Sequence, residues 1–209
     1  VSTNNFPINK KIIKIDSCSM AGYSSPGIVK TNQDNYFIIK EFLDDPEQFF
    51  LGVCDGHGSY GHLISEYICS NLEKNIKNTS SKEISNSFIK THKSLIENSK
   101  IDCTLSGSTC ISLLISIDKI ICANCGDCRA VLARYENGQY NAINLRRDHK
   151  QNKSDEMKRI LLNGGIIKQI YDNSLKEYIG PERIWIKNSE IPGLHISRSI
   201  GDNLAHSVG

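Results

Sequence analysis

A chain of 209 residues is long enough to bury a sizeable hydrophobic core, and its 39% hydrophobic and 23% charged residues exclude wholesale disorder. The 25 Lys and Arg residues nearly balance the 23 Asp and Glu residues, so the net charge of +2 excludes nucleic-acid binding driven by bulk charge. The longest apolar run, around residues 109–117, is too short to span a bilayer, and we expect no membrane segment.

The first half of the chain predicts strands followed by two helices. Residues 1–10 are polar and are expected to form a loose extension, while residues 11–15 alternate weakly, as in a strand. Two apolar runs of strand length and two segments with amphipathic helical spacing follow, at residues 36–40, 49–54, 61–76 and 84–98.

The second half predicts a dense region of strands and one further helix. Strands are expected at residues 109–117, 119–124, 130–135 and 139–145, with a hairpin turn at Asn137-Gly138. Ser154 is the expected N-cap of a helix over residues 154–163, and residues 168–193 are the least regular stretch. The whole pattern favours an α+β protein, an antiparallel β-sandwich with helices packed outside it.

Eight cysteines allow either free thiols or a metal site. Several lie inside apolar runs, where a free cysteine behaves as a small hydrophobe, so we expect reduced thiols and a cytoplasmic or nuclear location. Cys122, Cys125 and Cys128 form a C-x2-C-x2-C pattern, but zinc or iron–sulfur sites need a fourth ligand and no cysteine follows. Packing of small residues is the favoured interpretation, and a thiolate metal site is the alternative.

Two acidic residues mark the ends of predicted strands. Asp34 leads into one strand, and the sequence D-G-H-G, which begins at Asp55, ends the next. If these strands are neighbours, the two carboxylates approach each other, and a hard cation with oxygen ligands offsets their repulsion. His57 beside such a centre can exchange a proton near neutral pH. Taken alone, this segment is equally compatible with a turn and a surface histidine.

Four further segments complete an ordered set: S-G-S-T at residues 106–109, N-C-G-D-C-R-A at 124–130, D-H-K at 148–150 and S-R-S-I-G-D at 197–202. In this order and spacing, the segments from about residue 20 to residue 209 resemble the metal-dependent protein serine/threonine phosphatases of the PP2C (PPM) family. The resemblance implies the PP2C-like antiparallel β-sandwich flanked by helices, in α/β/β/α layers, with residues 1–209 as one catalytic domain.

The resemblance also implies site residues. Asp55 and the carbonyl of Gly56 correspond to ligands of two Mg²⁺ or Mn²⁺ ions, Asp34 to an acidic residue that holds metal-bound water, and Asp127 to a residue of a weaker third site. His57 corresponds to the general acid for the leaving group. The implied reaction is hydrolysis of phosphoserine and phosphothreonine by a metal-activated bridging water, without a phospho-enzyme.

The chain departs from the family pattern at three places. Val29 stands where many members carry a phosphate-binding Arg or Lys, so Lys30 is expected to bind phosphate instead. Gln33 stands where many members have Glu. The family continues beyond S-R-S-I-G-D with strands that carry two further Asp ligands, so we expect a domain incomplete at its C-terminus and weak or absent activity.

The expected partners are phosphorylated proteins, without nucleic acid or membrane. We expect a monomer, with association through exposed sheet edges as the alternative. Residues 169–193 match the family's flap beside the active site, with Trp185 packing it down, and the basic run at residues 146–150 is interpreted as a solvated loop. The competing function is a pseudophosphatase that acts as a regulatory or binding module.

Overall fold

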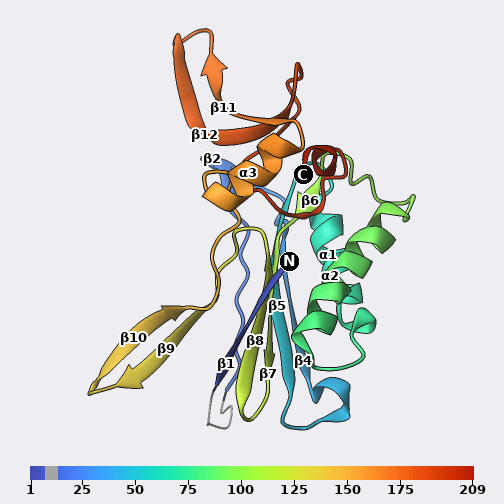
Figure 1. Ribbon diagram of the computed structural model, residues 1–209, viewed down its shortest axis with the longest axis vertical. Coiled ribbons are helices and arrows are strands. Elements are labelled where there is room, and N and C mark those ends of the chain that lie inside the picture. Colours follow the sequence, from blue (N-terminus) through green and yellow to red (C-terminus); the bar gives the residue numbers. More distant parts are fainter. Residues whose placement is uncertain (8–13) are drawn as a thin grey trace.

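The computed structural model describes residues 1–7 and 14–209 (Figure 1). Its central feature is a seven-stranded antiparallel sheet in the order β1-β8-β7-β5-β6-β14, with β4 paired to β5. The strands of this sheet are β1 (Ser2–Pro7), β4 (Asp34–Lys40), β5 (Phe49–His57), β6 (Gly107–Ser108), β7 (Cys110–Ile115), β8 (Lys119–Cys125) and β14 (Ile200–Gly201). Strands predicted at residues 36–40, 49–54, 109–117 and 119–124 are confirmed.

Three helices and several smaller strands complete the described structure. They are β2 (Tyr23–Ser25), β3 (Ile28–Val29), α1 (Gly61–Asn71), α2 (Ser81–Ile96), β9 (Val131–Glu136), β10 (Gln139–Asn144), α3 (Ser154–Leu162), β11 (Gly165–Asp172), β12 (Glu177–Ile186) and β13 (Pro192–Leu194). Short 3-10 turns occur at Phe42–Asp44, Glu73–Asn75 and Ala205–Val208.

One face of the large sheet forms the main core with α1 and α2. Phe50 of β5 and Leu114 of β7 are buried there together with Ile64 of α1 and Leu95 of α2. Figure 1 shows both helices on this one side of the sheet. Burial of each such side chain contributes roughly 1.5–3 kcal/mol, so this cluster fixes the helices against the strands that carry the candidate site.

The two helices form near their predicted positions. The helix expected at residues 61–76 is α1 followed by a 3-10 turn, and the helix expected at residues 84–98 begins earlier, at Ser81. The side chain of Ser80 explains this earlier start, because it accepts a hydrogen bond of 3.2 Å from the backbone N–H of Glu83 and caps the helix.

A β-hairpin covers part of the opposite face. β9 and β10 pair around Asn137 and Gly138, whose positive φ angles of 53° and 81° are those that an Asn-Gly hairpin turn requires. Leu132 and Ile143 pack against a buried cluster on β7 and β8. The predicted α+β class with antiparallel sheets and flanking helices is therefore confirmed, with helices on one side of the sheet and this hairpin on the other.

The N-terminal residues differ from the expected loose extension. Residues 2–7 form β1, which pairs with β8 from Ser2 opposite Asn124 to Pro7 opposite Lys119. Strand pairing uses main-chain hydrogen bonds, so a polar sequence can form the edge strand of a sheet. The polarity of these residues therefore did not indicate a loose extension. Residues 8–10, and most of the weak strand predicted at residues 11–15, lie outside the described residues.

The expectation of irregular structure at residues 168–193 is wrong. β11, β12 and β13 form a three-stranded antiparallel sheet, which projects from the large sheet at the top of Figure 1. Pro181 lies within β12 at an irregularity between the pairs Lys168↔Arg183 and Ile170↔Ile179, so it interrupts no ladder pair. Trp185 donates its indole N–H to the carbonyl oxygen of Lys168 (2.9 Å), which fastens β12 to β11.

Helix α3 confirms the helix predicted at residues 154–163, but its predicted cap is wrong. Ser154 is the first helical residue, and Lys153 occupies the N-cap position without a capping side-chain hydrogen bond. Acidic Asp155 and Glu156 occupy the first turn, where they interact favourably with the helix dipole. Among the described residues, none of the helices is both long and apolar enough to cross a membrane.

All eight cysteines are free, and the C-x2-C-x2-C pattern gathers no thiolate site. Cys125 packs in the core under the helices, whereas Cys122 belongs to the cluster on the opposite face of the sheet. Cys128 instead contacts Thr109, with 2.9 Å between Sγ and Oγ1. The three side chains therefore serve packing, as the favoured interpretation held.

Candidate metal centre

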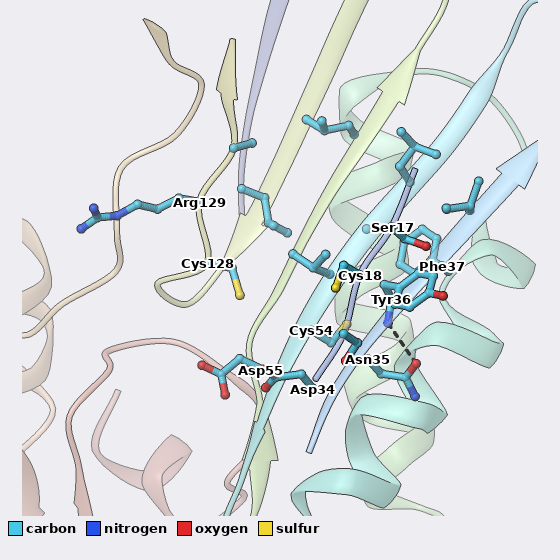
Figure 2. Close-up of a pocket in the computed structure, with 18 of the residues that line it drawn as sticks. Ser17, Cys18, Asp34, Asn35, Tyr36, Phe37, Cys54, Asp55, Cys128 and Arg129 are labelled. Atoms are coloured by element: carbon cyan, nitrogen blue, oxygen red, sulfur yellow. Dashed lines mark hydrogen bonds between the residues drawn. The ribbon is translucent and has the colours of Figure 1, made fainter. Parts of the chain in front are cut away.

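Asp34 and Asp55 lie opposite each other on neighbouring strands. β4 and β5 are antiparallel with Asp34 paired to Asp55, so both carboxylates leave the same face of the sheet. Figure 2 shows the two side chains next to each other. Thr109 anchors the Asp55 backbone: its Oγ1 accepts from the Asp55 N–H (3.1 Å), and its N–H donates to the Asp55 carbonyl oxygen (2.9 Å). The structure thus brings together the two carboxylates that the sequence singled out.

The surroundings of Asp55 disfavour its negative charge. Burial raises the pKa of the Asp55 carboxyl, and the negative charges of Asp34 and Asp127 raise it further, while His57 opposes the shift. A carboxylate whose ionised form is destabilised by like charges is stabilised when a cation binds between them. The electrostatics of the acidic corner, which Asp34 and Asp55 form, therefore favour a bound cation.

Gly56 and Gln33 are the chain neighbours of Asp55 and Asp34, and they pack against the start of α1. The Gly56 N–H donates to the Gln33 carbonyl oxygen (3.2 Å). A Cβ at Gly56 would lie 2.3 Å from the carbonyl oxygen of Gly61, so only glycine allows this close approach of strand and helix. The Gln33 Oε1 atom is buried and has no hydrogen-bond donor among the described residues.

His57 ends β5 and is held by a residue from the far end of the chain. Its Nε2 lies 2.7 Å from Oδ2 of Asp202. Asp202 is buried and also accepts a hydrogen bond of 2.5 Å from the Ser199 hydroxyl. A Cβ at Gly107 would lie 2.1 Å from the same carboxylate oxygen, so this glycine leaves room for the contact. Sequence reasoning assigned no role to Asp202, which lies 145 positions from His57.

Asp127 lies in the turn after β8, and its carboxylate forms an ion pair with Lys150. The Lys150 ammonium is 2.5 Å from Oδ2 of Asp127. The adjacent His149 is buried, and its Nδ1 accepts the backbone N–H of Gly126 (3.1 Å). The interpretation of residues 146–150 as a solvated loop is therefore wrong for His149 and Lys150, which fix the turn that carries Asp127.

Lys30 makes no side-chain contact that assigns it to the acidic pair. It is exposed after β3, and its backbone N–H donates to the carbonyl oxygen of Gly22 (2.8 Å). Its ammonium group forms no ion pair with any carboxylate of the described residues. Val29 beside it is also exposed. Phosphate binding by Lys30 therefore stays a prediction.

A groove of about 710 Å³ runs along the sheet face and reaches Asp34 and Asp55. Its sides are residues 15–20 and 128–131, and its floor consists of side chains from β4, β5 and β7, as Figure 2 shows in part. The floor is mostly apolar, and the acidic pair stands at one end. A ligand bound along this groove would place a polar group beside the carboxylates.

The donor set fits a hard divalent cation such as Mg²⁺ or Mn²⁺. The carboxylates of Asp34 and Asp55 are oxygen donors, which such cations prefer. Within residues 1–7 and 14–209, no three His, Cys, Asp or Glu side chains converge closely enough to hold a metal. A cation held by this corner would therefore keep water molecules among its ligands.

Comparison with known proteins places this chain in one family. The family model for protein phosphatase 2C matches residues 19–206. The chain is 31% identical over 210 residues to probable protein phosphatase 2C 35 of Arabidopsis thaliana, covering 91% of this chain and 60% of that protein. It is also 31% identical to probable protein phosphatase 2C 34 of the same plant, covering 90% of this chain and 57% of that protein.

Solved structures agree with this assignment at the level of the fold. The crystal structure of serine-threonine phosphatase 2C from Toxoplasma gondii superposes with a TM-score of 0.71 and 15% identity, covering 99% of this chain and 69% of that one. The chain belongs to the protein phosphatase 2C family. It spans about three fifths of the length of the Arabidopsis relatives that it matches.

Proposed function

We propose that the protein hydrolyses phosphoserine and phosphothreonine in phosphorylated proteins at the corner formed by Asp34 and Asp55. The observation that carries the proposal is the direct pairing of these two carboxylates across β4 and β5. Membership in the protein phosphatase 2C family, whose members are metal-dependent phosphatases, supports it. The free thiols are compatible with a cytoplasmic or nuclear setting, which we propose with it.

Asp34, Asp55 and the carbonyl of Gly56 are the proposed holders of Mg²⁺ or Mn²⁺. When bound, such cations lower the pKa of water and neutralise charge on the phosphoryl group. Asp127 is the proposed residue of a weaker third site, and its ion pair with Lys150 competes with that role. Lys30 is the proposed phosphate contact, acting as a point charge rather than as a bidentate donor.

His57 is the proposed general acid. It lies two residues beyond Asp55, at the end of the same strand, and its side chain is partly exposed. Departure of a serine or threonine alkoxide needs a proton because an alkoxide is a poor leaving group. Asp202 keeps the imidazole in one orientation through the contact at Nε2, which leaves Nδ1 as the second proton-exchanging atom.

The test is a pair of measurements on the 209-residue chain and its Asp55→Asn variant. We expect Mn²⁺ binding by calorimetry, and at most weak hydrolysis of a phosphothreonine peptide, which EDTA abolishes. Asp55→Asn should weaken Mn²⁺ binding at least about a hundredfold, because it removes the shared charge, and should reduce hydrolysis in parallel. Equal Mn²⁺ affinity of the two chains would contradict the proposed centre, and circular dichroism verifies that the variant is folded.

A pseudophosphatase is the second candidate. Val29 and Lys30 favour it, because Val29 carries no charge and Lys30 forms no ion pair with any carboxylate of the described residues. In a chain that also carries the family's two further Asp ligands, binding of phosphothreonine peptide with Mn²⁺ present but without release of phosphate would establish this alternative. Hydrolysis that depends on Asp55 would exclude it.

A further inference from the structure

The loop after β10 divides its basic residues between two directions. His149 and Lys150 turn inward to Gly126 and Asp127, as described above. Arg146 and Arg147, by contrast, line a separate cavity of about 620 Å³. The basic run at residues 146–150 therefore has two parts. Only the inward part, His149 and Lys150, supports the candidate metal centre.

The cavity is strongly cationic. Arg146 and Arg147 share its wall with Arg129, Lys153, Asp148 and Asn4. Four positively charged side chains thus face one carboxylate. Arg129 comes from the turn after β8, and Figure 2 shows it directed away from Asp34 and Asp55, so its guanidinium is separate from the acidic corner.

Two of the four cations already have carboxylate partners. Arg129 donates from Nη2 (2.7 Å) and Nε (3.0 Å) to the two oxygens of Asp148, a bidentate pair. Arg147 pairs with Asp155 at the start of α3. These contacts hold the loop in place and orient the wall of the cavity.

The other two cations have no carboxylate partner among the described residues. Arg146 is half-buried, and its Nε has no hydrogen-bond acceptor there. Burial lowers the pKa of the Arg146 guanidinium, and the nearby cations Arg147 and Arg198 lower it further. Lys153 likewise forms no ion pair within the described residues. A partly desolvated cation without an acceptor is stabilised by an anion that supplies one.

We propose that this cavity is an oxyanion-binding site that takes a carboxylate or phosphate group of an acidic polypeptide segment, with Arg146 and Lys153 as its unpaired donors. A guanidinium offers planar, paired donors that match carboxylate and phosphate oxygens. A polypeptide suits the site better than a nucleic acid, because the basic residues form one bounded cavity and the net charge of +2 provides no extended basic track.

The cavity is linked to the candidate metal centre through one turn. Arg129 follows Asp127 by two residues, and Asp148 precedes Lys150 by two. A segment held in the cavity would thus lie against the turn and loop that position Asp127. The binding proposal is independent of hydrolysis, because it requires neither the metal nor Asp55.

The test measures binding of a fluorescein-labelled, glutamate-rich peptide to the 209-residue chain by anisotropy in EDTA. A peptide of the same length with glutamine in place of glutamate is the neutral comparison. Arg146→Gln with Arg147→Gln should weaken binding of the acidic peptide about tenfold or more, since the pair removes one unpaired donor and one further positive charge from the wall of the cavity. Lys153→Gln alone, which leaves the half-buried arginine in place, should weaken it about threefold. Inorganic phosphate should compete.

The matched control removes two cations elsewhere, Lys77→Gln with Lys158→Gln, both exposed. We expect it to retain the wild-type affinity within about twofold. Equal losses in the control and the cavity variant would show attraction by bulk charge only and overturn the proposal. Tighter binding of the glutamine peptide, or displacement by single-stranded RNA at lower concentration than by the acidic peptide, would also overturn it. If the double arginine variant unfolds, an unchanged affinity of Lys153→Gln overturns it instead.

Discussion

Asp202 shows how one buried carboxylate can set the behaviour of a partly exposed histidine. It contacts His57 Nε2 and Ser199 Oγ with the same oxygen, Oδ2. Its backbone adopts φ +47°, an uncommon conformation for a non-glycine residue, and its N–H donates to the carbonyl oxygen of Ser106 (2.8 Å). These contacts hold the carboxylate still, so the imidazole that it binds is held as well.

Asp202→Asn should separate substrates by the quality of their leaving group. The change keeps the shape of the side chain and removes the charge that orients His57. We expect kcat for a phosphoserine peptide to fall about tenfold to a hundredfold, because alkoxide departure needs a proton. The kcat for p-nitrophenyl phosphate should change far less, because p-nitrophenolate leaves without one. An equal decrease for both substrates would indicate a general structural role for Asp202 and contradict the positioning role.

At the level of the elements, Gly52 determines how β4 and β5 pack. It lies opposite Phe37 on β4 and Ser112 on β7, in the middle of the sheet. A Cβ at Gly52 would lie 2.3 Å from the ring of Phe37, which itself packs on Phe50 with centroids 5.0 Å apart. The missing side chain therefore lets an aromatic ring lie over β5, the strand that carries Asp55.

Gly52→Ala should destabilise the sheet by about 1–3 kcal/mol, because the added methyl displaces a ring in a packed core. Urea unfolding followed by circular dichroism measures the free energy of unfolding. Gly22→Ala is the matched control: no atom lies within 4 Å of the added Cβ, so its free energy should stay within about 0.5 kcal/mol of the parent. A neutral Gly52→Ala would show that Phe37 moves aside without cost.

The sequence predicts those elements whose signals are local. Apolar runs of strand length predict β7 and β8, and Asn137-Gly138 predicts the β9–β10 hairpin, because both signals depend only on neighbouring residues. The strands β11 and β12 were missed, because Gly180 and Pro181 read as a loop although they fall at a pairing irregularity. β1 was missed because its order comes from pairing with β8, far away in the sequence.

For the whole molecule, the candidate centre is assembled from distant segments, and this limits what the sequence alone can predict. The pairing of Asp34 with Asp55 follows from two adjacent strands and was anticipated. The contacts of His57 with Asp202 and of Asp127 with Lys150 span 145 and 23 positions, and no local pattern encodes them. Only the ordered set of motifs pointed to those segments, without saying which side chains meet.

Mild acid should destabilise the whole fold through His149. Burial and, second to it, the positive charge of Arg198 lower the pKa of this histidine to about 4 from its ordinary value of 6.5, while its Nδ1 must stay unprotonated to accept the Gly126 N–H. Because the unfolded chain takes up the proton first, this stability is complete above pH 6.5 and is lost as the pH falls toward 4. Between pH 7 and about pH 5, the free energy of unfolding should drop by about 2 kcal/mol from this residue. His149→Gln should lower stability at pH 7 and flatten the pH dependence of the free energy of unfolding. An unaltered slope in His149→Gln would show that other groups control the acid response.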